Sequence, residues 1–380
     1  MSLENEIVKA SNGISATSYP MSIGELISLY RDKEIDLHPE YQRLLRWDIQ
    51  QKSKFIESIL LGIPIPSIVV YQRDDAVWEV IDGLQRLSTI FEFVGILGDE
   101  NGQIEPKSLI GTDYLPSLEG KRWQSPDDDD ENAEHFFTTS QRMAFKRAKI
   151  DVSIFYKKND PDIRYRLFQR LNAGGTKLSH QEARNYILQM INAKMVRLTK
   201  ELANFEPFNA CIVSSVHPKL IEEQYGVELV SKFFVYRTLE KKRMKNIHDF
   251  DEFLTEKMIE LARSKKFEAE KESDIFRKTF QLVWNACKHQ AFLKYVANED
   301  RYEGGFSIGA YEAITSGISA NIEQWHYEDE EHRLLQQKIK ELWGDKRFIS
   351  VSDSKNDFDR IRVLIPFGKE FFRHETIKNS

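Results

Sequence analysis

The chain has few cysteines, no long apolar run and no excess of positive charge. Its two cysteines, Cys211 and Cys287, are too few and too far apart for a disulfide framework or a zinc site, which fits a reducing compartment. No apolar stretch approaches the roughly 20 residues that span a bilayer, and the N-terminus has no signal-peptide core. These absences predict a cytoplasmic protein with no membrane segment.

The net charge of −6 excludes a protein-wide basic field that could hold nucleic acid. Contact with DNA would therefore need a local basic patch. Residues 241–245 and 265–266 are the candidates for such a patch, although a solvated helix end explains each of them more simply. The length of 380 residues favours two domains.

Hydrophobic periodicity predicts a first part of mixed helices and strands. Ser22 and Asp48 each stand where an N-cap opens a helix. Residues 68–72 and 77–81 are predicted strands joined by a hairpin loop, and a helical period begins at Leu84. Further predicted elements are a helix near 138–147, a strand over 149–156, a helix from 161 to about 172, and a helix that Ser179 caps.

Residues 97–135 resemble an insertion, because they are rich in Gly, Pro and Asp. They contain the acidic run 127–131. A solvated loop explains this run best, and a metal site is the minor alternative because adjacent carboxylates lack the spacing of a calcium loop.

The second part of the chain is predicted to be helical, because strand patterns nearly vanish after about residue 188. The fold is therefore predicted to be α+β, with a first domain over 1–187 and a helical domain over 188–380. Helical periodicity is found over 226–240, 247–265, 272–297 and 331–343.

The turn at Asp82-Gly83 is the first candidate site. A strand that ends here and runs straight into a helix leaves the first N–H groups of that helix unpaired, which makes an anion site. Gly83 permits close backbone approach, and Arg86 can reach the same point with a planar fork suited to phosphate. A plain turn, with Asp82 as N-cap and Arg86 on the surface, explains the pattern equally well. Gln85, Ser88 and Thr89 add neutral hydrogen-bonding groups.

A second cluster joins Tyr41-Gln42-Arg43 with Arg46-Trp47. Its guanidinium groups, amide and aromatic rings suit stacking on a base and binding of phosphate. Core packing of the aromatic residues, with the arginines paired to nearby acids, is the alternative.

A third cluster follows a predicted helix and runs from Asn172 through Gly175 to Thr176. One glycine is an ordinary helix cap, but Gly174 and Gly175 together, with polar neighbours on both sides, exceed what a cap needs. The cluster could shape a polar loop against a ligand, although it lacks the spacing of a phosphate loop.

Together the three clusters, in this order, resemble the DUF262 family, which has an Asp-Gly-Gln-Gln-Arg motif and is related to the ParB/sulfiredoxin-like fold. The resemblance covers about residues 20–187. It implies a small mixed sheet and a role in bacterial restriction of modified foreign DNA, with nucleoside triphosphate binding and hydrolysis in this domain. Carried over by position, the matching residues are Gln42, Arg43, Asp82, Gly83, Gln85, Arg86, Asn172, Gly175 and Thr176.

The resulting hypothesis is a nucleotide-binding protein, and a candidate NTPase. Arg86 and the backbone at Gly83 would hold phosphate, Arg43 would add positive charge, and Gln42 and Gln85 would orient ligand or water. Asp82 would hold Arg86 or Mg²⁺, since triphosphates usually arrive as magnesium complexes. The assigned catalytic residues are Asp82, Gln85 and Arg86, and Ser88 and Thr89 join the nucleotide-binding set.

Two departures from the family pattern leave alternatives open. Leu84 stands where the first Gln is usual, which removes an amide from the turn and puts hydrolysis in doubt, and Ser88 replaces a common Thr. The scattered histidines form no HNH-type nuclease motif. One alternative is therefore a non-catalytic DNA-binding or sensor subunit whose nuclease is a separate chain. A nuclease that uses the ParB-like pocket itself is the second.

Overall fold

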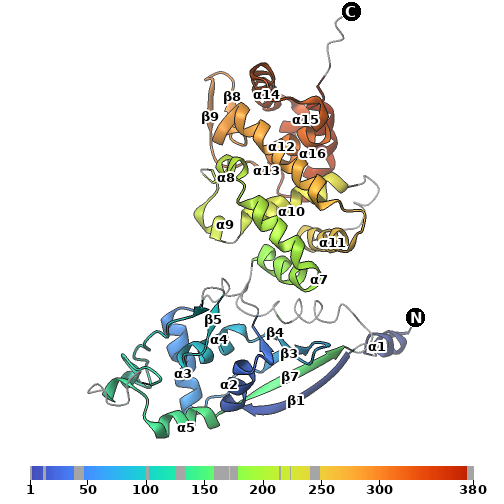
Figure 1. Ribbon diagram of the computed structural model, residues 1–380. Coiled ribbons are helices and arrows are strands. Elements are labelled where there is room, and N and C mark those ends of the chain that lie inside the picture. Colours follow the sequence, from blue (N-terminus) through green and yellow to red (C-terminus); the bar gives the residue numbers. More distant parts are fainter. Residues whose placement is uncertain are drawn as a thin grey trace, which may run out of the picture. The chain divides into compact units, whose positions relative to one another are not determined.

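The computed structural model describes residues 2–11, 14–37, 47–99, 102–124, 133–157, 171, 179–213, 215–222, 224–239 and 249–374. The chain forms two compact units, Met1–Leu178 and Ser179–Ser380 (Figure 1). The sequence-based boundary at residue 187 falls inside helix α7 (His180–Ala203), which belongs to the second unit.

A five-stranded mixed sheet forms the centre of the first unit, with the strand order β1-β7-β3-β4-β2. The β1–β7 and β3–β4 pairs are antiparallel, whereas the β3–β7 and β2–β4 pairs are parallel. The prediction of an α+β fold with a small mixed sheet is confirmed. The strands are β1 (Ile14–Ser22), β2 (Ile35–Asp36), β3 (Ile68–Gln72), β4 (Trp78–Asp82) and β7 (Lys149–Lys157).

Side-chain caps begin three helices at the positions where the sequence predicted N-caps. The Ser22 hydroxyl accepts from the Glu25 N–H, and Asp48 forms a reciprocal capping box with Gln51. Ser179 caps α7 in the same way. The helices of the first unit are α1 (Leu3–Ser11), α2 (Ile23–Arg31), α3 (Ile49–Leu61), α4 (Leu84–Phe93) and α5 (Thr139–Arg147).

One hydrophobic core joins this sheet to helices α2 to α5. Ile68 and Val70 of β3 and Val152 and Ile154 of β7 are almost completely buried in it. Each pair is spaced by two residues, so one face of the sheet supplies these side chains. Phe91, at the centre of α4, packs into the same core.

The insertion over 97–135 packs against that core more closely than a solvated loop would. Leu109, Leu118 and Trp123 are buried, because they reach the hydrophobic cluster of the first unit. The acidic run 127–131 lies outside the described residues. The short elements of the insertion are β5 (Gly98–Asp99), β6 (Gly102–Gln103), η2 (Pro116–Leu118) and η3 (Ala133–His135).

The second unit is mainly helical, as predicted. The helix predicted over 272–297 is wrong beyond Cys287, because Lys288 has a φ of 52° that ends α12. A short hairpin of β8 (Lys294–Val296) and β9 (Arg301–Glu303) follows. The remaining elements are α8 (Glu206–Ile212), α9 (Pro218–Glu222), α10 (Tyr225–Thr238), α11 (Phe250–Arg263), α12 (Ala269–Cys287), η5 (Lys288–Gln290), α13 (Ile308–Ala320), η6 (Ile322–Gln324), α14 (Asp329–Leu342), α15 (Lys346–Ile349) and α16 (Asp357–Phe371).

Among the described residues, no helix is both long enough and apolar enough to cross a membrane.

A buried ion pair joins α13 to α16 in the core of the second unit. Arg360 donates from Nε to Glu312 Oε2 at 2.7 Å and from Nη2 to Oε1 at 2.9 Å, and Tyr236 donates to the same carboxylate. The Glu312 side chain is fully buried, and burial raises the pKa of its carboxyl against the opposing effect of Arg360. Removal of Arg360 would leave the buried Glu312 carboxylate without this charged partner, whereas Arg360 also pairs with Asp357.

We expect Arg360→Met to lower the free energy of unfolding by about 3–5 kcal/mol, because the Glu312 carboxylate would stay buried without its partner. Arg347→Met is the matched control, since Arg347 is half exposed and pairs with Glu370 at 3.3 Å. Its loss should cost at most about 1 kcal/mol. Urea unfolding of both variants measures the difference, and equal losses would contradict this account.

Both cysteines should resist thiol reagents in the folded protein. Burial raises the pKa of the Cys287 thiol to about 12 and moves that of Cys211 well above its ordinary value. Only the thiolate is reactive, and neither side chain is accessible. A disulfide reagent at pH 8 should therefore label neither thiol until urea unfolds the second unit. Rapid labelling without urea would refute the burial of both side chains.

Candidate functional site

A β-bulge precedes the turn that carries the Asp-Gly motif. Val69 pairs with Asp82 and Val70 pairs with Val80, so one extra residue of β4 lies between the two pairs. Bulges of this kind re-aim side chains at the end of a strand. Here the bulge lies immediately before the turn and sets the direction of Asp82.

Gly83 connects β4 to α4 in a conformation that suits only glycine. Its φ is 99°, and a Cβ atom added here would lie 3.0 Å from Cγ1 of Ile68. The first intrahelical bond runs from the Leu87 N–H to the Gly83 carbonyl. Residues 84–86 therefore form the N-terminal turn of α4, where N–H groups precede the first intrahelical bond.

Arg86 lies in this turn, but its guanidinium is engaged by protein groups. Nη2 donates to Asp82 Oδ2 at 2.8 Å, and Nη1 donates to the carbonyl oxygens of Pro66 and, at 3.0 Å, Ser67. The Arg86 side chain is only 12% exposed. Arg86 thus ties the start of α4 to the end of β4 and to the loop before β3.

The hydroxyl groups of Ser88 and Thr89 turn back onto their own helix. Ser88 donates to the Gln85 carbonyl at 3.1 Å and Thr89 donates to it at 2.7 Å, and both residues are buried. The Gln85 side-chain oxygen accepts from the Trp47 N–H at 3.4 Å. In this structure Gln85 binds the backbone, and neither hydroxyl is turned toward Arg86.

Several predicted site residues lie outside the described residues. These are Gln42 and Arg43 of the second cluster and Asn172, Gly175 and Thr176 of the third cluster. The described residues on either side of 38–46 nevertheless lie near α4. Leu37 lines the same pocket as Leu84 of α4, and Trp47 contacts Gln85. Leu37 and Trp47, the described residues nearest to this segment in sequence, thus both lie near α4.

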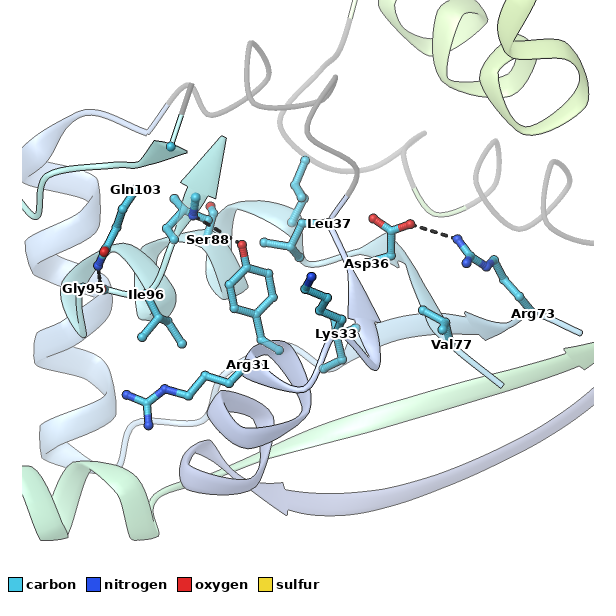
Figure 2. Close-up of a pocket in the computed structure, with 16 residues that line it drawn as sticks. Arg31, Lys33, Asp36, Leu37, Arg73, Val77, Ser88, Gly95, Ile96 and Gln103 are labelled. Atoms are coloured by element: carbon cyan, nitrogen blue, oxygen red, sulfur yellow. Dashed lines mark hydrogen bonds and ion pairs between the residues drawn. The ribbon is translucent and has the colours of Figure 1, made fainter. Parts of the chain in front are cut away.

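A pocket of about 730 Å³ lies beside the first turns of α4 (Figure 2). Leu84 and Ser88 of α4 line it, with Tyr30 of α2 stacked on Phe91 at 4.2 Å. Tyr30 Oη also accepts from the Gly98 N–H at 3.5 Å, which holds the insertion at the pocket edge. The other lining residues are Arg31, Lys33, Ile35, Asp36, Leu37, Arg73, Val77, Gly95, Ile96, Leu97, Gly102 and Gln103.

Three cationic side chains line this pocket, and they differ in how they are engaged. Arg73 donates to Asp36 at 2.9 Å and makes a two-bond pair with Asp75, which raises the pKa of the Arg73 guanidinium and lowers that of the Asp75 carboxyl. Arg31 and Lys33 are exposed at the rim. The pocket thus combines an apolar wall with a cationic rim, an arrangement that suits an anionic ligand with an apolar part.

Arg86 lies on the opposite side of α4 from this pocket. With about 100° of rotation per residue, Leu84 and Ser88 share one face of the helix, and Arg86 is about 200° from Leu84. This geometry agrees with the contacts of Arg86 to the loop before β3. Arg86 therefore contacts the loop before β3 on the face of α4 that points away from the pocket.

The carboxylates of Asp82 and Asp36 are the groups near the motif and the pocket that could bind Mg²⁺. Asp82 has one oxygen on Arg86, which leaves the other for a metal, and Asp36 lines the pocket beside Arg73. Among the described residues no group of three His, Cys, Asp or Glu side chains could hold a metal ion. Mg²⁺ commonly takes one or two carboxylates plus substrate phosphates, so these residues fit a nucleotide-bound ion and not a dedicated metal cage.

Sequence reasoning missed the pocket residues Arg31, Lys33, Asp36 and Arg73. They lie in a helix end, a turn, a two-residue strand and a hairpin loop, which the sheet brings together. No local motif marks them. A positive φ of 63° at Lys33, which the sequence does not reveal, is their one unusual backbone feature.

The comparisons with known proteins agree with the position of these clusters. Residues 23–189 match the family model described as the GmrSD restriction endonuclease, N-terminal domain. That range includes the pocket, the Asp-Gly motif and the clusters at 41–47 and 172–176. No curated protein and no solved structure matches the chain.

Replacement of Gly83 by alanine should destabilise the first unit more than the same change at Gly62. Both glycines have positive φ, so each variant bears about 1–2 kcal/mol of backbone strain. Only at Gly83 does the new methyl group also crowd Ile68, since nothing lies within 4 Å of a Cβ at Gly62. Thermal unfolding compares the two variants, and a smaller loss at Gly83 would contradict the close packing of this turn.

Proposed function

Because residues 23–189 belong to the DUF262 family of restriction-protein N-terminal domains, we propose that the pocket beside α4 binds a nucleoside triphosphate. The family indicates a restriction-type defence system. In this proposal the chain works in the cytoplasm on foreign DNA, and nucleotide binding controls or drives that work.

The observation that carries the proposal is the pocket at the first turn of α4. Its volume of about 730 Å³ suits a small ligand. The N–H groups of a helix start and its dipole favour phosphate, and Leu84, the first residue of α4, lines the pocket. The exposed ends of Arg31 and Lys33 add positive charge at the rim.

Each residue then has a proposed role. Lys33 and Arg31 bind the phosphates, and the apolar wall that includes Leu37 and Leu84 receives the less polar part of the ligand. Arg86 is a positioning residue, because its donors hold Asp82 and the loop before β3. Gln42, Arg43, Asn172, Gly175 and Thr176 remain the proposed contacts from the other two clusters.

Mg²⁺ is proposed to arrive with the triphosphate and to supply charge neutralisation at the phosphates. Asp82 is the proposed protein ligand, which requires the triphosphate to extend from the pocket to the end of β4, since Asp82 does not line the pocket. Asp82 and Gln85 keep the catalytic assignment as a proposal, whereas Arg86, also assigned as catalytic from the sequence, is proposed to position Asp82.

A second candidate function is nucleotide sensing without turnover. Leu84 lines the pocket with an apolar side chain at the position where the motif usually has an amide. An apolar group can orient neither a water molecule nor a phosphate oxygen. In this case the chain would be a sensor or DNA-binding subunit, and a separate chain would be the nuclease.

Titration calorimetry with Mg²⁺, together with phosphate release, tests these functions. We expect the native protein to bind at least one nucleoside triphosphate and Lys33→Gln to bind it about tenfold more weakly, because a charge-assisted contact to phosphate is lost. Lys54→Gln is the control, since Lys54 is exposed on α3 and does not line the pocket. It should bind as the native protein does.

The outcomes separate the candidates. Binding with phosphate release supports the NTPase, and binding without release supports the sensor. Arg86→Ala should lose both binding and thermal stability, as expected of a positioning residue, whereas lost binding with native stability would make Arg86 a direct ligand. If the native protein bound no nucleoside triphosphate, the nucleotide proposal would fail.

A further inference from the structure

Strand β1 forms one edge of the five-stranded sheet (Figure 1). All nine of its residues, from Ile14 to Ser22, pair with β7 on one side. On the other side, no strand in the described part of the chain pairs with β1. As far as the described residues show, a long row of outward backbone donors and acceptors of β1 is thus available to another partner.

The first six residues of β1 lack the features that usually protect such an edge. Residues 14–19 contain no charged residue, no proline and no glycine. Natural edge strands are commonly blocked by lysine, proline, a bulge or a covering loop. Here the register with β7 is continuous, and the side chains of residues 16–20 are exposed.

Pro20 indicates which backbone groups of β1 point outward. Proline has no N–H, so within a sheet it is placed where the donor would face away from the neighbouring strand. In an antiparallel strand the N–H and C=O groups of one residue point to the same side, and the side alternates along the chain. The groups of Ala16 and Ser18, which share the parity of Pro20, therefore face outward with those of Ile14.

We propose that this edge pairs with the same edge of a second copy of the chain, antiparallel and centred on Ala16. A two-fold axis at Ala16 sets Ala16 opposite Ala16 of the second copy and Ile14 opposite Ser18. Each outward residue then exchanges hydrogen bonds, and Pro20 is left outside the paired segment. The two five-stranded sheets would continue into each other.

A second copy suits this edge better than a different protein for two reasons. Antiparallel pairing is symmetric, so an edge strand is always complementary to itself in hydrogen bonding. The segment also carries no charge, so no like charges oppose each other across the axis. In addition, α1 precedes β1 in the chain and exposes Leu3 (69%) and Ile7 (57%), which a second copy could cover.

A disulfide experiment tests the register. In a hydrogen-bonded antiparallel pair the two Cα atoms at the axis are about 5.5 Å apart, within the range of a disulfide. Ala16→Cys should therefore give a covalent dimer under mild oxidation of the full chain. Ser18→Cys is the matched control on the same face of β1. Its two copies would be offset by about 14 Å, so it should not cross-link.

Sedimentation measures the association itself. The native chain should sediment as a dimer that dissociates on dilution. Ala16→Lys should weaken the dimer at least tenfold, because two ammonium groups would meet at the axis, whereas Ala16→Ser should leave it unchanged. A monomeric native chain, equal cross-linking of the two cysteine variants, or a dimer that tolerates Ala16→Lys would each overturn the proposal.

Discussion

Gly83 carries the chain from β4 into α4 with a φ of 99°, and the geometry of the candidate site depends on that turn. The turn places the N-terminus of α4 at the end of β4 and packs the backbone against Ile68 of β3. Leu84 and Ser88 then face the pocket, while Arg86 faces the loop before β3. A residue with a side chain at this position would disturb the sheet and the pocket together.

The position of Arg86 changes the interpretation of the motif. An arginine one turn into a helix that follows Asp-Gly suggests that it binds phosphate, since the planar guanidinium group can donate two parallel hydrogen bonds to phosphate oxygens. In the structure the same guanidinium group binds Asp82 and two backbone carbonyl oxygens, which a lysine could not do with the same geometry. The cationic groups that remain exposed at the pocket, Arg31 and Lys33, come from outside the motif. The motif thus builds the site, and other segments supply its rim.

Local sequence patterns predict those helices and strands whose formation depends on interactions within a few residues. The caps at Asp48 and Ser179 and the strand over β7 are examples, because capping and side-chain alternation act within a few residues. Strand β1 was not predicted, because its edge position exposes it and removes the apolar alternation. The pocket and the contacts of Arg86 with Pro66 and Ser67 depend on segments that only the folded sheet brings together. The residues assigned at 42–43 and 172–176 stay predictions.

We propose that a nucleoside triphosphate binds between the start of α4 and the segment that runs from α2 to β2. Hydrogen exchange of the full chain, with and without Mg²⁺ and the triphosphate, tests it most directly. The account predicts slower exchange of the amides of residues 84–86 and of residues 31–37 when the nucleotide is present. Unchanged exchange in both segments under saturating nucleotide, or slower exchange confined to the second unit, would contradict it.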